Sequence, residues 1–221
     1  MMKKSQVSSR KSQVSSKKPI LLILFFVFCL WSMVYGLWSS FAQEASEVKP
    51  EEAKHIFVYA DKDSPENSFS PSEWIGDKEA LSFNDGWEKD PQQGKTCIRI
   101  DYKAMGSFGW AGIYWVNPQG NWGNERGGYD LRFAKKLTFW VRGEKGGEHI
   151  AVFKFGGLKG VFPDSDNHGI GPIILTPQWQ EISVDVSPRD MKYIGAGFSF
   201  AISKAYNRQG CVFYIDNIKY E

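Results

Sequence analysis

Apolar and polar residues alternate along much of the chain beyond residue 54, and this period of two predicts β-strands. In WQEISVDV (179–186), Ile182, Val184 and Val186 alternate with polar residues, which predicts one buried and one solvent-facing side. No stretch beyond residue 43 has a helical period over ten or more residues. We therefore expect an all-β fold, an antiparallel β-sandwich or barrel. The predicted strands are 55–60, 96–102, 111–116, 136–142, 149–155, 170–176, 179–186, 196–202 and 211–220.

The connections between these strands differ in length and composition. GEKGGE (143–148) is rich in glycine and predicts a hairpin turn between strands 136–142 and 149–155. Residues 61–95 contain few strand-forming runs and predict a long loop. A loop of this length in a compact domain usually has a function or packs a small core of its own.

A basic, apolar leader precedes the strand region. We expect residues 1–18 to be a disordered basic segment and residues 19–42 to be a signal peptide or a membrane anchor. The uncharged run 20–38 is close to the ~20 residues that a membrane-spanning helix needs. Basic residues precede this run and acidic residues follow it, so the positive-inside rule places the remainder outside the cytoplasm. Ser40 and Ala42 are small residues at the −3 and −1 positions of a predicted signal-peptidase site after Ala42.

The leader leaves two outcomes open for the rest of the chain. Cleavage after Ala42 makes the protein periplasmic or secreted, whereas retention of the 20–38 helix anchors it in the membrane. Residues 43–54 are acidic and predict a linker. Residues 55–221 are then the exported β-sandwich domain, which is long enough for one hydrophobic core.

The positive charge of the chain belongs to the leader. The whole sequence has 27 Lys and Arg against 25 Asp and Glu, but six of the cations precede residue 43. The remaining 21 basic and 25 acidic residues give the part of the chain beyond the leader, 43–221, a net charge of −4. Because nucleic-acid binding depends on basic patches, we expect no nucleic-acid partner.

Cysteine usage leaves the redox state open. Cys97 and Cys211 lie in two different predicted strands. An oxidising compartment permits a disulfide between them if their Cα atoms lie within about 7 Å, and two buried thiols are the alternative. No spacing of Cys and His suggests zinc.

Aromatic residues in glycine- and asparagine-rich surroundings are the candidate binding residues. Seven of the nine tryptophans follow the leader. Trp122 lies in the polar loop NPQGNWG (117–123), where its ring could stack on a sugar while Asn121 and Arg126 bind hydroxyl groups. Large rings beside glycines in loops are costly to expose, and outside the cytoplasm their commonest partner is a sugar.

Further candidate residues lie in the neighbouring strand and in the loops. In 109–116, Tyr114 shares one face with Trp110 while Trp115 points to the other, so at least one of Tyr114 and Trp115 is structural. Trp74 lies in the long loop 61–95 and is a further candidate. In PDSDNHG (163–169), the two carboxylates could orient a sugar or belong to a solvated turn. The candidate ligand-binding residues are Trp74, Tyr114, Trp115, Asn121, Trp122, Arg126, Asp164 and Asp166.

Three segments resemble a known family. KLTFWVRGEKGGE (136–148), WQEISVDVS (179–187) and CVFYIDNIKYE (211–221) are similar to strands of bacterial exported β-sandwiches related to carbohydrate-binding modules, with a galactose-binding-domain-like jelly roll. The resemblance covers roughly residues 55–221. It implies a polysaccharide or oligosaccharide as partner, although assembly factors share this fold without binding sugar.

The resemblance also implies a structural calcium ion. Related sandwiches commonly hold one between the first and last strands, and Asp216 lies in the apolar final strand. Asp61 and Asp63, just after the first strand, are its expected co-ligands. The alternative is that the Asp216 carboxylate turns outward at a bulge near Asn217.

We therefore expect a non-catalytic, exported or membrane-anchored, glycan-binding β-sandwich. The chain has no GxSxG, HExxH or P-loop motif. An envelope assembly protein with the same fold is the first alternative, and it predicts a convex apolar patch. A small polysaccharide-cleaving enzyme is the second, and it predicts two convergent carboxylates in an aromatic cleft, one with a raised pKa.

Overall fold

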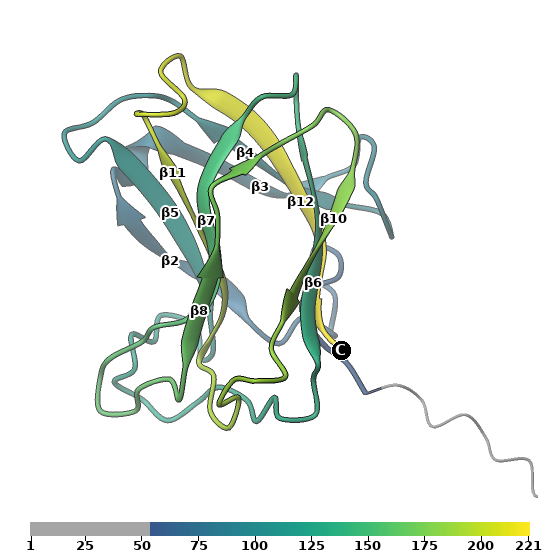
Figure 1. Ribbon diagram of the computed structural model, residues 1–221, viewed down its shortest axis with the longest axis vertical. Helices are drawn as coiled ribbons and strands as arrows, with labels where there is room; N and C mark the ends of the chain where they lie inside the picture. Colours follow the sequence, from purple (N-terminus) through teal and green to yellow (C-terminus); the bar gives the residue numbers. More distant parts are fainter. Residues whose placement is uncertain (1–53) are drawn as a thin grey trace, which may run out of the picture. The chain divides into compact units, whose positions relative to one another are not determined.

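The computed structural model describes residues 54–221, which form two antiparallel β-sheets. Sheet A has the strand order β10-β6-β12-β4-β3, with β1 paired to β12. Sheet B has the order β2-β5-β11-β7-β8, with β9 paired to β7. Figure 1 shows β2, β5, β11, β7 and β8 as neighbours, with β12, β6 and β10 to their right. The expected all-β, antiparallel sandwich is confirmed.

The strands of each sheet have the following bounds. Sheet A consists of β1 (Ile56–Tyr59), β3 (Leu81–Trp87), β4 (Cys97–Tyr102), β6 (Lys136–Gly143), β10 (Gln180–Asp185) and β12 (Cys211–Tyr220). Sheet B consists of β2 (Ser70–Gly76), β5 (Trp110–Val116), β7 (His149–Gly156), β8 (Asn167–Ile170), β9 (Ile173–Ile174) and β11 (Ala196–Ser203). A short 3-10 helix, η1 (Lys78–Ala80), joins β2 to β3.

The core lies between the two sheets and is rich in aromatic rings. Phe139 of sheet A packs against Phe153 and Phe198 of sheet B, with ring centroids 4.8 Å and 5.0 Å away. Trp115 packs against Phe198 at 5.5 Å. Such tilted and edge-on aromatic pairs add to the free energy gained by burying apolar area. The alternation predicted for 179–186 is confirmed, since Val184 and Val186 are buried while their polar neighbours are exposed.

Two strands lie where a long loop was expected. β2 and β3 fall within residues 61–95, so that expectation is wrong. Each lies at one end of the strand order of its sheet and is therefore an edge strand. Edge strands tolerate turn-forming residues because one side of the strand makes no ladder hydrogen bonds. Pro71 in β2 and Asn84-Asp85-Gly86 in β3 are such turn-forming residues, and they led to the prediction of a loop.

The turn 143–148 is not a hairpin. β6 belongs to sheet A and β7 to sheet B, so this segment crosses from one sheet to the other. The composition indicated a turn, and only the pairing partners of β6 and β7 show what the turn connects. Similarly, the predicted strand 170–176 is divided, with Gly171 and Pro172 separating β8 from the two-residue β9.

The two domain cysteines are free thiols, so the disulfide alternative is wrong. Cys211 pairs with Tyr102 in the β4–β12 ladder, whereas Cys97 lies at the opposite end of β4. Burial raises the pKa of each thiol to about 12. Both thiols are therefore protonated and unreactive at neutral pH.

The expectations for residues 1–53 lie outside the described residues. They concern the basic segment, the signal peptide or anchor and most of the acidic linker. Within the described part of the chain, no helix is long and apolar enough to cross a membrane.

Candidate functional site: the outer face of sheet B

The strand β5 presents an aromatic surface on the side of sheet B that faces away from the core. Ala111, Ile113 and Trp115 point into the main core. Trp110 and Tyr114 alternate with them and point outward. Trp110 is 38% exposed, and Tyr114 is covered by its neighbours. The sequence allowed either face of this strand to be buried, and the structure buries the Trp115 face.

Small residues lie at the centre of this outer face. Gly112 of β5 pairs with Ala201 of β11. A Cβ atom added at Gly112 would lie 2.3 Å from the carbonyl oxygen of Phe200, so only glycine permits this approach of the two strands. Gly112 and Ala201, with the Ile75 side chain of β2 against Gly112, form the floor of the outer face between the outward rings of β5.

Charged and polar side chains border Tyr114. Glu73 of β2 and Ser199 of β11 pair with Tyr114 in the two ladders, and Lys154 of β7 pairs with Ser199. The Lys154 ammonium lies 5.0 Å from the centroid of the Tyr114 ring. This cation–π contact holds a hydrogen-bond donor at the aromatic surface. Glu73 supplies an acceptor on the other side of Tyr114.

Trp122 extends the aromatic surface from a loop. Its ring is 39% exposed, and its centroid lies 5.7 Å from that of Tyr114. The loop is tied to β2, because the Gly120 amide donates to the Ser72 hydroxyl at 2.9 Å. Trp122 and Tyr114 thus form one aromatic pair, called the shelf below, in which Trp122 is exposed and Tyr114 is buried.

The loop that carries Trp122 is organised by Asn121. Its buried Oδ1 accepts the amides of Gly123, Asn124 and Glu125 at 2.9–3.1 Å. Its Nδ2 donates to the carbonyl of Glu125 at 2.9 Å. These four bonds hold the loop in one conformation and thereby position the neighbouring tryptophan.

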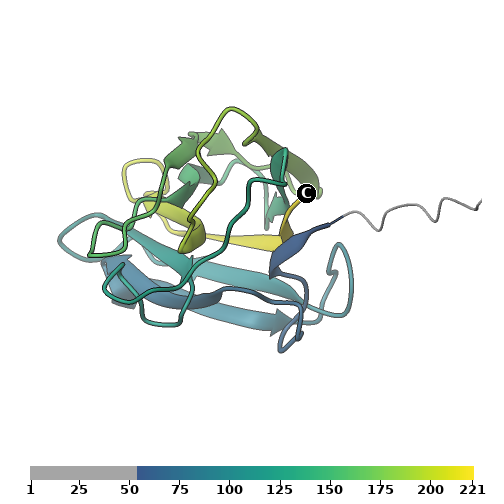
Figure 2. The ribbon, with the colours of Figure 1, turned by 90° about the horizontal axis from the view of Figure 1, so that it is seen from below.

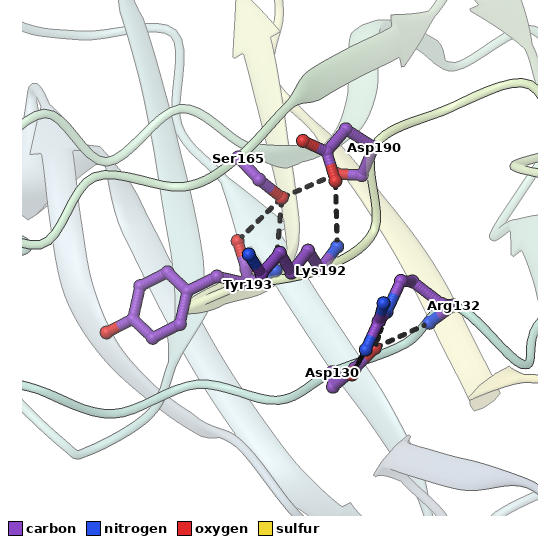
Figure 3. A network of polar contacts seen from close by, with 6 residues as sticks. All are labelled: Asp130, Arg132, Ser165, Asp190, Lys192 and Tyr193. Carbon is purple, nitrogen blue, oxygen red and sulfur yellow. Dashed lines mark hydrogen bonds and ion pairs between the residues drawn. The ribbon is translucent and has the colours of Figure 1, made fainter.

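The loops at this end of the sandwich are linked to one another, and they lie nearest the viewer in Figure 2. The Ser165 hydroxyl bonds with the backbone of Asp190 and Tyr193, as Figure 3 shows. The Tyr193 hydroxyl accepts the Gly127 amide at 2.9 Å, which joins this network to the Trp122 loop. Arg126 is exposed, and its guanidinium carbon lies 5.6 Å from the Phe162 ring centroid.

Comparison with known proteins agrees with this architecture. No protein-family model and no curated protein sequence matches the chain. Among solved structures, it is similar to a family 30 carbohydrate-binding module with a TM-score of 0.51 and 16% identity, over 76% of this chain and 98% of that one. The fold is that of a carbohydrate-binding module.

Two further modules are similar at lower scores. One is the family 30 module of a cellulosomal cellulase of Clostridium thermocellum, with a TM-score of 0.49, 15% identity and coverage of 76% and 97%. The other is a family 11 module from Clostridium thermocellum in complex with a β-1,3-1,4-mixed-linked tetrasaccharide, with a TM-score of 0.47, 14% identity and coverage of 75% and 94%. At these identities the likeness concerns the fold alone.

The structure brings together only part of the predicted binding set. Trp122 and Tyr114 share the shelf, whereas Arg126 lies over the Phe162 ring. Trp115 is 1% exposed and fills the core, so its assignment as a ligand contact is wrong. Trp74 is not in a loop but in β2, where it points inward and packs against Phe83 at 5.9 Å. Its ring therefore stabilises the core.

The polar residues assigned to sugar binding have structural roles. The Asn121 amide is used within its own loop, as described above. Both oxygens of Asp164 accept backbone amides, those of Leu158, Gly195 and Ala196. Asp166 accepts the Asp190 amide at 3.2 Å. These side chains hold the loops in place, and sugar binding by them stays a prediction.

The sequence did not single out several residues that complete the site. Lys154, Glu73 and the floor formed by Gly112 and Ala201 come from four strands. Each is an ordinary residue in its own strand. Only strand order and register bring them beside Tyr114, and no local pattern carries that information.

The expected calcium ligands do not form a cluster. Asp216 is fully buried, so the alternative of an outward carboxylate is wrong, although the expected bulge exists at Asn217. Its oxygens accept the amides of Gln92, Gln93 and Asn217. The Oδ1 atom of Asp61 accepts the amides of Lys95 and Thr96, while Asp63 is exposed.

The backbone N–H groups that point at the Asp61 and Asp216 carboxylates do not favour a bound cation there. An N–H group that points at a carboxylate oxygen occupies the position that a metal ion would take. The described residues contain no group of three His, Cys, Asp or Glu side chains suited to a metal. Calcium binding stays a prediction, and the geometry of Asp216 does not favour it.

Proposed function

We propose that the protein is a non-catalytic glycan-binding module that uses the outer face of sheet B. The observation that carries this proposal is the exposed Trp122 ring beside Tyr114, on the outer face of sheet B. The apolar face of a pyranose can lie on the indole. Lys154 and Glu73 can donate to and accept from its hydroxyl groups.

The extent of this face suits an oligosaccharide. Trp110 and Tyr114 are four residues apart on β5, which corresponds to ~13 Å along the strand. Trp122 extends the surface beyond Tyr114. A single sugar would cover only part of it, so affinity should rise with chain length. For a short chain we expect dissociation constants of roughly micromolar to millimolar, because few atoms are buried.

The environment of the buried carboxylates supports a non-catalytic role. A glycosidase needs two convergent carboxylates, one with a raised pKa. Among the described residues, burial raises the pKa of the aspartates Asp164 and Asp216. Asp216 accepts the backbone amides of Gln92 and Gln93, and Asp164 accepts that of Leu158. These bonds give both carboxylates a structural role.

The cellular context belongs to the same proposal. We propose that the leader exports the module, which is either anchored by residues 20–38 or released by cleavage after Ala42. A galactose-binding-domain-like jelly roll is the finer fold assignment that we propose. In this position the module would meet polysaccharides outside the cytoplasm.

Electrophoresis through gels containing single soluble polysaccharides tests the glycan proposal. The native protein should be retarded by at least one polysaccharide of a broad panel, and Trp122→Ala should abolish the retardation. Trp140→Ala is the matched control, because Trp140 lies on sheet A, in β6. Unchanged retardation of Trp122→Ala would remove the site assignment. Retardation by no polysaccharide would favour the envelope assembly role instead.

A further inference from the structure

A cavity lies at the end of the sandwich opposite to Trp122. Its volume is about 920 Å³, and it is lined by the segment 101–105, the β6–β7 turn 144–148 and the loop 206–212. β5 begins near the first of these segments and ends at the Trp122 loop, and it separates the two sites by roughly 20 Å. A cavity of this size accommodates a small ligand.

A buried carboxylate with an unused oxygen lines this cavity. Glu148 is only 6% exposed. Its Oε1 accepts the Lys145 amide at 2.8 Å, whereas its Oε2 has no hydrogen-bond partner among the described residues. A Cβ atom at Gly143 would lie 1.8 Å from Oε2, so the glycine makes room for the carboxylate. A buried acceptor without a partner costs free energy unless a ligand satisfies it.

A hydroxyl group lies at the same end of the sandwich. Tyr102 is 1% exposed, and its hydroxyl lies beside the Lys204 backbone amide. Glu148 supplies an acceptor, and Tyr102 supplies a group that donates or accepts. A ligand that satisfies both carries hydroxyl groups of its own.

The charges around the cavity indicate a neutral ligand. Lys103, Lys145 and Arg208 balance Asp101, Glu144 and Glu148 along its wall. The described residues offer no cluster of acidic or histidine side chains for a metal ion. Tyr206 is exposed at the cavity, with its ring centroid 5.1 Å from that of His149. An aromatic ring beside polar groups suits a sugar, which has both apolar and hydroxyl surfaces.

We propose that this cavity is a second saccharide site that binds the end of a chain. An open hollow between turns can take a terminal sugar, whereas the outer face of sheet B can accept the interior of a chain. The site does not depend on the sheet B face. One molecule could then hold two glycan chains, or two parts of one chain, with a gain in avidity.

Amide chemical shifts measured by NMR test this site directly. The probes are D-glucose, D-mannose, D-galactose and D-xylose, each added alone at high concentration to the native protein. We expect at least one sugar to shift the amides of 144–148 and 206–210 while those of 117–123 stay unchanged. Glu148→Gln should weaken this binding at least tenfold, because the neutral amide is a poorer acceptor of sugar hydroxyls.

Two further variants keep the result interpretable. Glu181→Gln, an exposed residue of β10, is the matched control and should bind as the native protein does. Tyr206→Ala removes an exposed ring with little effect on folding and should also weaken binding. The proposal is overturned if none of the four sugars shifts the cavity amides, or if both Glu148→Gln and Tyr206→Ala bind normally. Retardation in polysaccharide gels reports on the Trp122 site separately, so failure of either site is distinguishable.

Discussion

The buried carboxylate of Asp216 should make the stability of the protein depend on pH. The pKa of this group is raised from 3.8 to about 6, because burial and, to a smaller extent, the nearby charge of Asp61 outweigh the opposing effect of the amide hydrogen bonds. In the unfolded chain the ordinary value returns. The native state therefore binds this proton more tightly than the unfolded state does.

The sign and size of the effect follow from this difference. The contribution of Asp216 to the free energy of unfolding is complete below pH 3.8 and is lost as the pH rises through 6. A shift of about two pKa units, at 1.36 kcal/mol per unit, corresponds to roughly 3 kcal/mol. Asp216→Asn does not ionise, so from about pH 4 to about pH 7 the native protein should lose roughly 3 kcal/mol relative to the variant.

Urea unfolding followed by tryptophan fluorescence at a series of pH values measures this difference. The loss of one hydrogen-bond acceptor in Asp216→Asn adds an offset that does not change with pH. Asp63→Asn is the matched control, because Asp63 is exposed and its substitution should leave the slope unchanged. A constant difference in unfolding free energy between native protein and Asp216→Asn across this range would refute the reasoning. Stabilisation of the native protein alone by added calcium at neutral pH would show that a cation, and not desolvation, controls this carboxylate.

Two other predictions concern the interior. Trp115→Ala should reduce the free energy of unfolding by about 3–5 kcal/mol in urea titrations, because it leaves a cavity among Phe83, Phe198 and Phe200; a loss below about 1 kcal/mol would contradict its place in the core. Cys97, which is fully buried, should react with a thiol reagent only after unfolding, and reductant should leave the melting temperature unchanged because both cysteines are free thiols. A drop in melting temperature with reductant would indicate a disulfide.

Local pattern was sufficient to predict most strands and their buried faces. The alternation in 96–102 and 179–186 correctly separates core residues from outer ones, because successive side chains of a strand point to opposite faces whatever the strand pairs with. The loop position of Trp122 was also visible, since NPQGNWG has no alternation that could bury the ring. Edge strands β2 and β3 were missed, because an edge tolerates the proline, asparagine and glycine that locally indicate loops.

The sequence by itself therefore determined the all-β class, most strand positions and the exposed tryptophan of the shelf. The tertiary structure alone decided which face of β5 is buried, which sheet receives each end of the 143–148 turn, and which charged residues lie beside Tyr114. It also decided that Asn121 organises the loop while Lys154 borders the shelf. The physical reason is that strand order and register depend on contacts between segments far apart in the chain, to which no single segment's pattern refers.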